Sequence, residues 1–161
     1  ISGNFVDAKD IATHWPTYKE GANNTGKKVT YEKWRVGRSV LVTNNNSEAE
    51  EIINDPDGVF SHYFLYLNTV GKLASGVLGK DIKLKDELPA AIEKAKDLII
   101  IGDKKTVTEK LINFIDTVGP FGTLLLTGHD MTNRKELWNN SFTLMSKSIQ
   151  PTLSKYMEQK F

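Results

Sequence analysis

The last third of the chain alternates short apolar runs with amphipathic stretches, and this alternation limits the possible folds more than any other feature. Residues 98–101 form an apolar run that ends at Gly102. Apolar side chains then recur at helical spacing over residues 105–118. A second apolar run follows at residues 121–127. Because continuous apolar strands that alternate with helices are typical of a covered parallel sheet, the predicted fold class is α/β.

Three further segments show clear periodicity. Residues 7–22 predict a helix, which Pro16 is expected to end or kink. Residues 34–43 are rich in β-branched side chains and predict a strand. Residues 133–156 predict a final helix, which Pro151 is expected to kink or break. Only three strands are therefore expected, which is too few to close a barrel.

The middle of the chain is less regular. Ser47 with Glu50 three residues later predicts a capping box, with a helix that begins directly after Ser47. The apolar residues 59–67 predict another helix. Residues 71–88 contain three glycines and a charged run, and they predict a long loop. Pro89 is expected to open a short helix after this loop.

Composition narrows the possible functions. The length of 161 residues predicts one domain. The net charge is +1, which excludes an overall basic field, so no nucleic-acid partner is expected. No apolar run is long enough to span a membrane. Cysteine is absent, which excludes disulfides and agrees with a cytoplasmic location. The chain begins with Ile1 rather than Met, so we expect that its start is missing.

Few residues have the spacing of a chemical site. The three histidines are not spaced as metal ligands, so no metal site is expected. His129 follows a predicted strand, where α/β proteins place their chemistry. It is a candidate for contact with substrate, or it orders the turn together with Asp130. Asp103 lies at a strand–helix junction that suits either an anion or a helix cap, and the cap is the favoured interpretation.

Several motifs together resemble the luciferase-like flavin-dependent monooxygenases, the family of bacterial luciferase. Residues 99–111 resemble the block that forms strand seven and helix seven of that family, although Lys104 stands where a proline is usual. Residues 119–130 resemble its strand eight. Residues 141–151 resemble its closing helix. Upstream, residues 14–15 and 34–35 also fit the family pattern.

This resemblance covers nearly the whole chain and implies a partial fold. Residues 1–161 would be the C-terminal half of a (β/α)8 TIM barrel: about strands six to eight with their helices, plus the end of strand five. The segment 71–88 resembles a lid or insertion over the flavin. A complete barrel needs about 250 residues, so the resemblance implies that the chain is a fragment.

The resemblance also implies a function. The parent protein would be an FMN-dependent monooxygenase that uses reduced flavin and dioxygen to oxygenate a small organic substrate, and a partner flavin reductase would supply the reduced FMN. Ser2, Gly3 and Asn4 match the position that binds the cofactor, while the catalytic residues are expected on the absent half. The isolated chain is predicted to be inactive.

Two alternatives remain open. One is a non-catalytic half-barrel that binds flavin or acts as a scaffold. Such a protein would be completed by self-association or by a partner chain, because a half-barrel exposes strand edges and apolar surface. For the same reason a homo-oligomer is expected. A further alternative is a deazaflavin cofactor in place of FMN.

Overall fold

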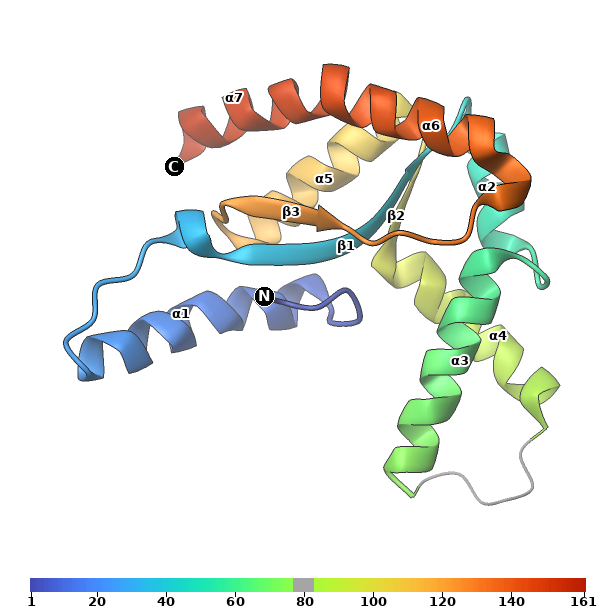
Figure 1. The fold of residues 1–161 in the computed structure, drawn as a ribbon, viewed down its shortest axis with the longest axis horizontal. Coiled ribbons are helices and arrows are strands. Elements are labelled where there is room, and N and C mark those ends of the chain that lie inside the picture. The colour runs from blue at the N-terminus through green and yellow to red at the C-terminus, as the bar shows by residue number, and fades with distance from the viewer. Residues whose placement is uncertain (77–82) are drawn as a thin grey trace.

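The structure is a computed structural model that describes residues 1–76 and 83–161. Figure 1 shows the strands with helices on either side of them. In chain order the elements are α1 (Ala8–Asn24), η1 (Tyr31–Lys33), β1 (Arg35–Val42), α2 (Asn46–Asn54), α3 (Val59–Ala74), α4 (Leu84–Leu98), β2 (Ile99–Gly102), α5 (Lys104–Val118), β3 (Thr123–Leu126), η2 (Thr132–Arg134), α6 (Lys135–Leu144), the π-helical η3 (Met145–Ile149) and α7 (Gln150–Lys160).

The three strands form a parallel sheet in the order β2-β1-β3. β1 is long enough to pair twice: Arg35–Arg38 lie beside β3, and Ser39–Val42 lie beside β2. In a (β/α)8 barrel, successive strands are neighbours, so β2 would lie between β1 and β3. The observed order differs from that expectation, because β2 and β3 pair with opposite edges of β1. The fold class α/β is as predicted.

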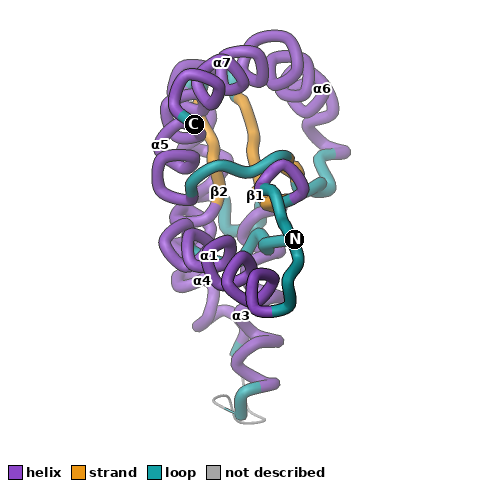
Figure 2. The backbone as a smooth tube through the Cα atoms, turned by 90° about the vertical axis from the view of Figure 1, so that its left-hand side faces the viewer, coloured by secondary structure: helices purple, strands orange, loops and turns teal. Residues whose placement is uncertain are grey.

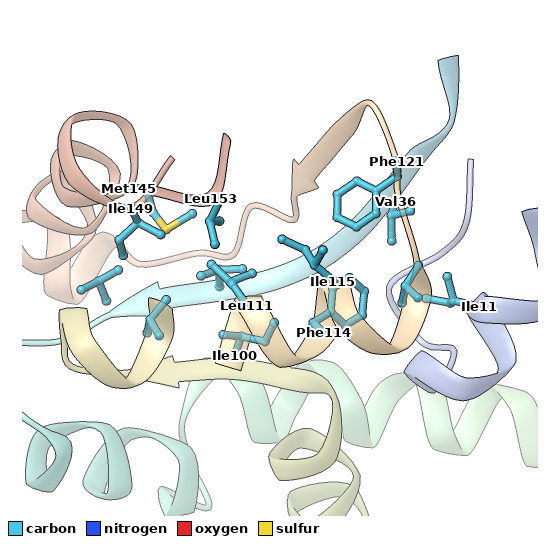
Figure 3. Packing of buried hydrophobic residues seen from close by; sticks show 14 of the residues in the cluster. Ile11, Val36, Ile100, Leu111, Phe114, Ile115, Phe121, Met145, Ile149 and Leu153 are labelled. Carbon is cyan, nitrogen blue, oxygen red and sulfur yellow. The ribbon is translucent and has the colours of Figure 1, made fainter. Parts of the chain in front are cut away.

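Helices pack on both faces of the sheet, as the side view in Figure 2 shows. Side chains on β1 alternate between the faces. Val40 belongs to an apolar cluster with residues of α1, α5 and α7, part of which is shown in Figure 3. Leu41 belongs to a second cluster with residues of α2, α3 and α4. A complete barrel carries its helices on the outside only, whereas this three-stranded sheet is covered on both faces.

The loop predicted over residues 71–88 is wrong at both flanks. α3 continues to Ala74, and α4 begins at Leu84, one turn before the predicted start at Pro89. Asp86 and Glu87 stabilise the first turn of α4, because acidic side chains favour a helix N-terminus. The central part of the predicted lid, residues 77–82, lies outside the described residues.

Two other local predictions need correction. The N-cap of α2 is Asn45, not Ser47, because the Asn45 side chain accepts a hydrogen bond from the Glu48 N–H. The Glu48 carboxylate accepts from the N–H of Asn44, one residue before the cap, rather than from the N-cap N–H that a capping box uses. The C-terminal helix is not broken at Pro151. It passes through the π-helical turn η3, which changes the hydrogen-bond spacing where Pro151 supplies no N–H.

Candidate functional site

Three polar side chains from distant parts of the sequence meet beside β1. The Asn4 side-chain Nδ2 donates to Ser39 Oγ at 2.8 Å, and Asn4 Oδ1 accepts from the Ser39 backbone N–H at 2.7 Å. Ser39 Oγ also lies 2.7 Å from His129 Nε2. Asn4 and Ser39 are buried, and His129 is half-buried. Two of the residues named from the sequence, Asn4 and His129, are therefore joined through Ser39.

The sheet brings these residues together past the carboxyl end of β3, beside the middle of β1. Asn4 follows the bridge that pairs Ser2 with Val36 of β1. His129 follows the end of β3, whose last residue lies opposite Arg38. Both segments therefore leave the sheet where β1 reaches Ser39. Ligand sites in open α/β sheets lie beyond the carboxyl ends of the strands. The cluster meets this condition for β3, whereas β1 and β2 continue past Ser39.

An aromatic layer covers the imidazole of His129. The ring of Phe60 contacts it edge-on with centroids 4.9 Å apart, and the ring of Tyr63 does the same at 4.8 Å. Burial among these rings lowers the pKa of His129 below its usual value of 6.5. The imidazole is therefore neutral at pH 7 and presents one N–H donor and one acceptor nitrogen.

Phe5 extends this aromatic layer toward solvent. Its ring lies 5.5 Å from the ring of Tyr63 and 6.1 Å from that of Phe64, and its side chain is 41% exposed. The layer is therefore apolar, partly open and adjacent to a neutral imidazole. Such a surface can contact a flat aromatic ring by stacking or edge contacts.

Ser2 does not join this cluster. Its hydroxyl lies 2.9 Å from His14 Nδ1 and accepts a hydrogen bond from Trp34 Nε1 at 2.9 Å. The indole of Trp34 stacks on that of Trp15, with ring centroids 5.8 Å apart. Ser2 is buried in this second cluster at the amino end of β1, so its hydroxyl already has two partners.

Gly3, between these two clusters, is exposed. No other atom lies within 4 Å of the position that a Cβ would take at Gly3. The backbone at this point is therefore open to an approaching molecule. Of the three candidate cofactor residues, Ser2 and Asn4 use their side chains internally, and Gly3 offers free space.

Asp103 and Asp130 both act locally. Asp103 caps α5 by accepting from the Thr106 N–H at 2.8 Å, and this bond lowers the pKa of the Asp103 carboxyl. Asp130 accepts from the N–H and the hydroxyl of Thr132, which likewise lowers its pKa. The helix-cap interpretation of Asp103 is confirmed. Asp130 orders its turn through Thr132, and no hydrogen bond between Asp130 and His129 occurs in the described part of the chain.

Two hollows lie away from the His129 cluster. One of about 680 Å³ adjoins Trp15 and Trp34 at the amino end of β1. The other, of about 430 Å³, is an apolar groove between α5, β3 and α7, lined among others by Leu124 and Leu153. Within residues 1–76 and 83–161, no three or more His, Cys, Asp and Glu side chains are grouped to hold a metal ion. None of the described helices is both long and apolar enough to cross a bilayer.

Sequence reasoning missed Ser39, Phe5, Phe60 and Tyr63. Ser39 lies inside a strand, where a small polar residue gives no motif. The three aromatic residues belong to apolar patterns that predict core packing equally well. One signal is available: the polar pair Arg38 and Ser39 interrupts the apolar pattern of residues 36–42, and a buried hydroxyl needs a partner.

Comparison with known proteins identifies a relative. No protein-family profile matches the sequence. The chain is 27% identical over 152 residues to 3,6-diketocamphane 1,6-monooxygenase of Pseudomonas putida, and the match covers 92% of this chain and 40% of the relative. The chain therefore spans about two fifths of the length of this curated relative.

A solved structure is also similar. It is the oxygenating constituent of 3,6-diketocamphane monooxygenase from the CAM plasmid of Pseudomonas putida, a type II Baeyer–Villiger monooxygenase in complex with FMN. The TM-score is 0.63 at 23% identity, over 88% of this chain and 39% of that one. At this identity the likeness shows the fold alone. Together the two comparisons confirm the resemblance of this chain to the luciferase-like flavin-dependent monooxygenases.

Proposed function

We propose that this chain works as part of an FMN-dependent monooxygenase that uses reduced flavin and dioxygen to oxygenate a small organic substrate. The observation that carries the proposal is the 27% identity with a monooxygenase over 152 residues, nearly the whole of this chain. The Asn4–Ser39–His129 cluster past the carboxyl end of β3 supports it independently.

The described residues fit a flavin in part. Gly3 leaves its backbone open, and the layer of Phe5 and Tyr63 suits the flat face of an aromatic ring system. The side-chain amide of Asn4 is not free to bind a cofactor, because it is bonded to Ser39. Asn4 therefore supports the site through Ser39. The hydroxyl of Ser2 has two internal partners, so Ser2 fits better as a support for this segment than as a direct ligand.

FMN, when bound, supplies the electrons that activate dioxygen. The chain's own contribution is position and a dry surface. Phe60 and Tyr63 exclude water from one side of His129, and Phe5 extends their layer. Neutral His129 holds a ring proton that it can donate in a hydrogen bond to the cofactor or substrate. This donor role extends the prediction that His129 lies on the substrate face.

A separate flavin reductase is the proposed source of reduced FMN. The solved relative is described as an oxygenating constituent, a term that leaves the reducing step to another component. The substrate would be a small organic molecule that reaches the aromatic layer around His129.

The barrel and the lid also remain proposals. The parallel strands and the helices between them support membership of a (β/α)8 barrel in the complete enzyme. In that barrel β3 would pair with β2 instead of β1. Of the lid predicted over residues 71–88, the part at residues 77–82 lies outside the described residues.

The decisive experiment starts with the gene. The open reading frame that contains the Ile1 codon is sequenced and expressed whole, and FMN binding is measured by flavin fluorescence. Oxygenation of a cyclic ketone is then assayed with reductase-supplied reduced FMN. Turnover by the whole product, and none by residues 1–161 alone, is the expected result. Absence of both FMN binding and turnover in the whole product would refute the proposal.

One observation favours a non-catalytic alternative. The apolar groove of about 430 Å³ beside β3 leaves hydrophobic side chains accessible, which favours association with another chain. Light scattering on residues 1–161, combined with the FMN assay, distinguishes a monooxygenase part from a non-catalytic scaffold. A stable oligomer without FMN binding would indicate a scaffold.

A further inference from the structure

Arg38 is a charged side chain with almost no access to water. It lies on β1 next to Ser39 and is 3% exposed. Its Nη1 donates to the carbonyl of Asn4 at 3.2 Å, and its Nη2 donates to the carbonyl of Val6 at 2.7 Å. The guanidinium also lies over the ring of Phe114, 4.6 Å from its centroid. Two carbonyls and one ring therefore fix the orientation of this group.

The charge of Arg38 is retained without a direct ion pair. Burial lowers the pKa of Arg38 to about 10, so the group is still protonated at pH 7. None of the ion pairs found among the described residues includes Arg38, and Asp7, which acts on it at longer range, is paired with Lys94. A buried charge held in this way is weak evidence for stability. The buried position of Arg38 is therefore better explained by the segment to which it is hydrogen-bonded.

What it holds is the segment of Asn4. Arg38 and Ser39 are consecutive on β1, so their side chains point to opposite faces of the sheet. Both nevertheless reach Asn4: Arg38 binds its main-chain carbonyl, and Ser39 binds its side-chain amide. The main chain and the side chain of Asn4 are thus fixed by two adjacent residues.

The hydroxyl of Ser39 links Asn4 to His129. Asn4 Nδ2 donates to Ser39 Oγ, and the hydrogen of that hydroxyl then donates to His129 Nε2. This assignment follows from the partners, because no third partner of Ser39 Oγ occurs in the described part of the chain. Neutral His129 consequently carries its proton on Nδ1, which leaves Nδ1–H as the donor that the network does not use.

We propose that Arg38 is a positioning residue, which fixes the Asn4 segment and thereby holds His129 in the Nδ1–H form on the candidate cofactor face. The meaning of this role for catalysis rests on the proposed function. The positioning itself does not, because it concerns contacts within this chain.

The test follows the ring nitrogens of His129 by ¹⁵N NMR in Arg38→Met and Arg38→Lys, with His129→Gln to assign the signal. Lys110→Met is the matched control, because Lys110 also donates to a backbone carbonyl, that of Ile101 at 2.8 Å. Val118→Ala is a second control, which destabilises the same apolar cluster without contact to Asn4. Thermal unfolding is recorded for every variant.

We expect the wild-type chain and both controls to show one protonated and one unprotonated nitrogen in His129. In Arg38→Met the difference between the two nitrogen shifts collapses toward an average, because both ring forms become populated. Arg38→Lys shows a partial collapse, since an ammonium group cannot hold two carbonyls as a guanidinium does. If Arg38→Met does not fold, Arg38→Lys alone decides.

An unchanged His129 signal in the folded Arg38 variants would overturn the proposal and leave Arg38 a purely structural residue. A collapse that also occurs in Val118→Ala would overturn it as well, since general destabilisation would then be the cause. If the collapse is specific but the whole gene product binds no FMN, the positioning role stands and the proposed function fails. The two failures are therefore distinguishable.

Discussion

The side chain of Asn4 makes two hydrogen bonds to Ser39: its Oδ1 accepts from the Ser39 backbone N–H at 2.7 Å, and its Nδ2 donates to Ser39 Oγ at 2.8 Å. The two residues are 35 positions apart in sequence. An amide is the side chain that can accept and donate at once with this reach. The pairing therefore depends on Asn4 being an amide rather than merely polar.

Replacement of Asn4 by Asp should disturb His129 more than it disturbs the fold. A carboxylate still accepts from the Ser39 N–H, but it also takes the hydroxyl hydrogen that His129 receives in the wild type. The added negative charge near His129 raises the imidazole pKa above the wild-type value. An NMR titration of His129 measures this shift. Asn23→Asp, at the exposed end of α1, is the control and should leave the His129 titration unchanged.

Removal of the amide altogether should cost stability. Asn4→Ala leaves the buried Ser39 N–H without its partner, which costs about 1–3 kcal/mol in the free energy of unfolding. Urea unfolding followed by circular dichroism measures the loss. A variant as stable as the wild type would show that Ser39 finds another acceptor.

The stability of the chain should fall in mild acid because of His129. Its pKa in the folded state lies below that of the unfolded chain, about 6.5, so unfolding takes up a proton in this range. The contribution is complete above pH 7 and decreases as the pH falls below about 6.5. It stops decreasing once the pH has passed below the folded-state pKa.

The measurement is urea unfolding between pH 7.5 and pH 5, on the wild type and on His129→Gln. The variant should lose most of this pH dependence. His62→Gln is the matched control, because His62 is exposed on α3, and it should keep the wild-type profile. An identical pH profile for the wild type and His129→Gln would contradict the prediction.

The sequence predicts the elements better than their arrangement. The boundaries of α5 agree with prediction to within a residue, because its apolar period, its Asp103 cap and its Gly119 end all favour the same helix. The strand order could not be predicted in the same way. It depends on which edge of β1 each short strand pairs with, and β2 and β3, of four residues each, carry no local signal for that choice.

The candidate site could be predicted in part for a similar reason. His129 has a positional signal, because it follows a strand, and Asn4 is indicated by resemblance. Ser39, which joins them, lies 90 residues from His129 and gives no motif of its own. Contacts over such separations follow from the packing of the sheet. The role of Ser2 as an internal support likewise depends on Trp34, 32 residues away.

Gly122 should not tolerate a side chain. A Cβ at this position would lie 1.7 Å from the carbonyl oxygen of Glu32, which belongs to the backbone of η1 and cannot rotate away. The N–H of Gly122 donates to the Trp34 carbonyl at 3.0 Å, so the two segments cannot separate without losing that bond. Gly122→Ala should therefore lose about 3 kcal/mol or more, beyond the usual cost of overpacking.

Gly128 provides the matched control for that substitution. No other atom lies within 4 Å of a Cβ built there, and Gly128 is not among the glycines with positive φ. Gly128→Ala should change the free energy of unfolding by no more than about 0.5 kcal/mol. Comparable losses in both variants would show that the approach of Gly122 to Glu32 is not a constraint on the fold.

Ser2→Ala separates the structural role of Ser2 from a cofactor role. Loss of the hydroxyl leaves the indole N–H of Trp34 without its acceptor, which should cost about 1–3 kcal/mol of stability. FMN affinity of the whole gene product should fall less than in Asn4→Ala, because Asn4 adjoins His129 and Ser2 does not. Thermal unfolding and flavin fluorescence titration measure the two effects on the same samples. A large loss of FMN affinity with unchanged stability would instead make the Ser2 hydroxyl a direct ligand of the cofactor, and it would move the candidate flavin site toward His14 and Trp34.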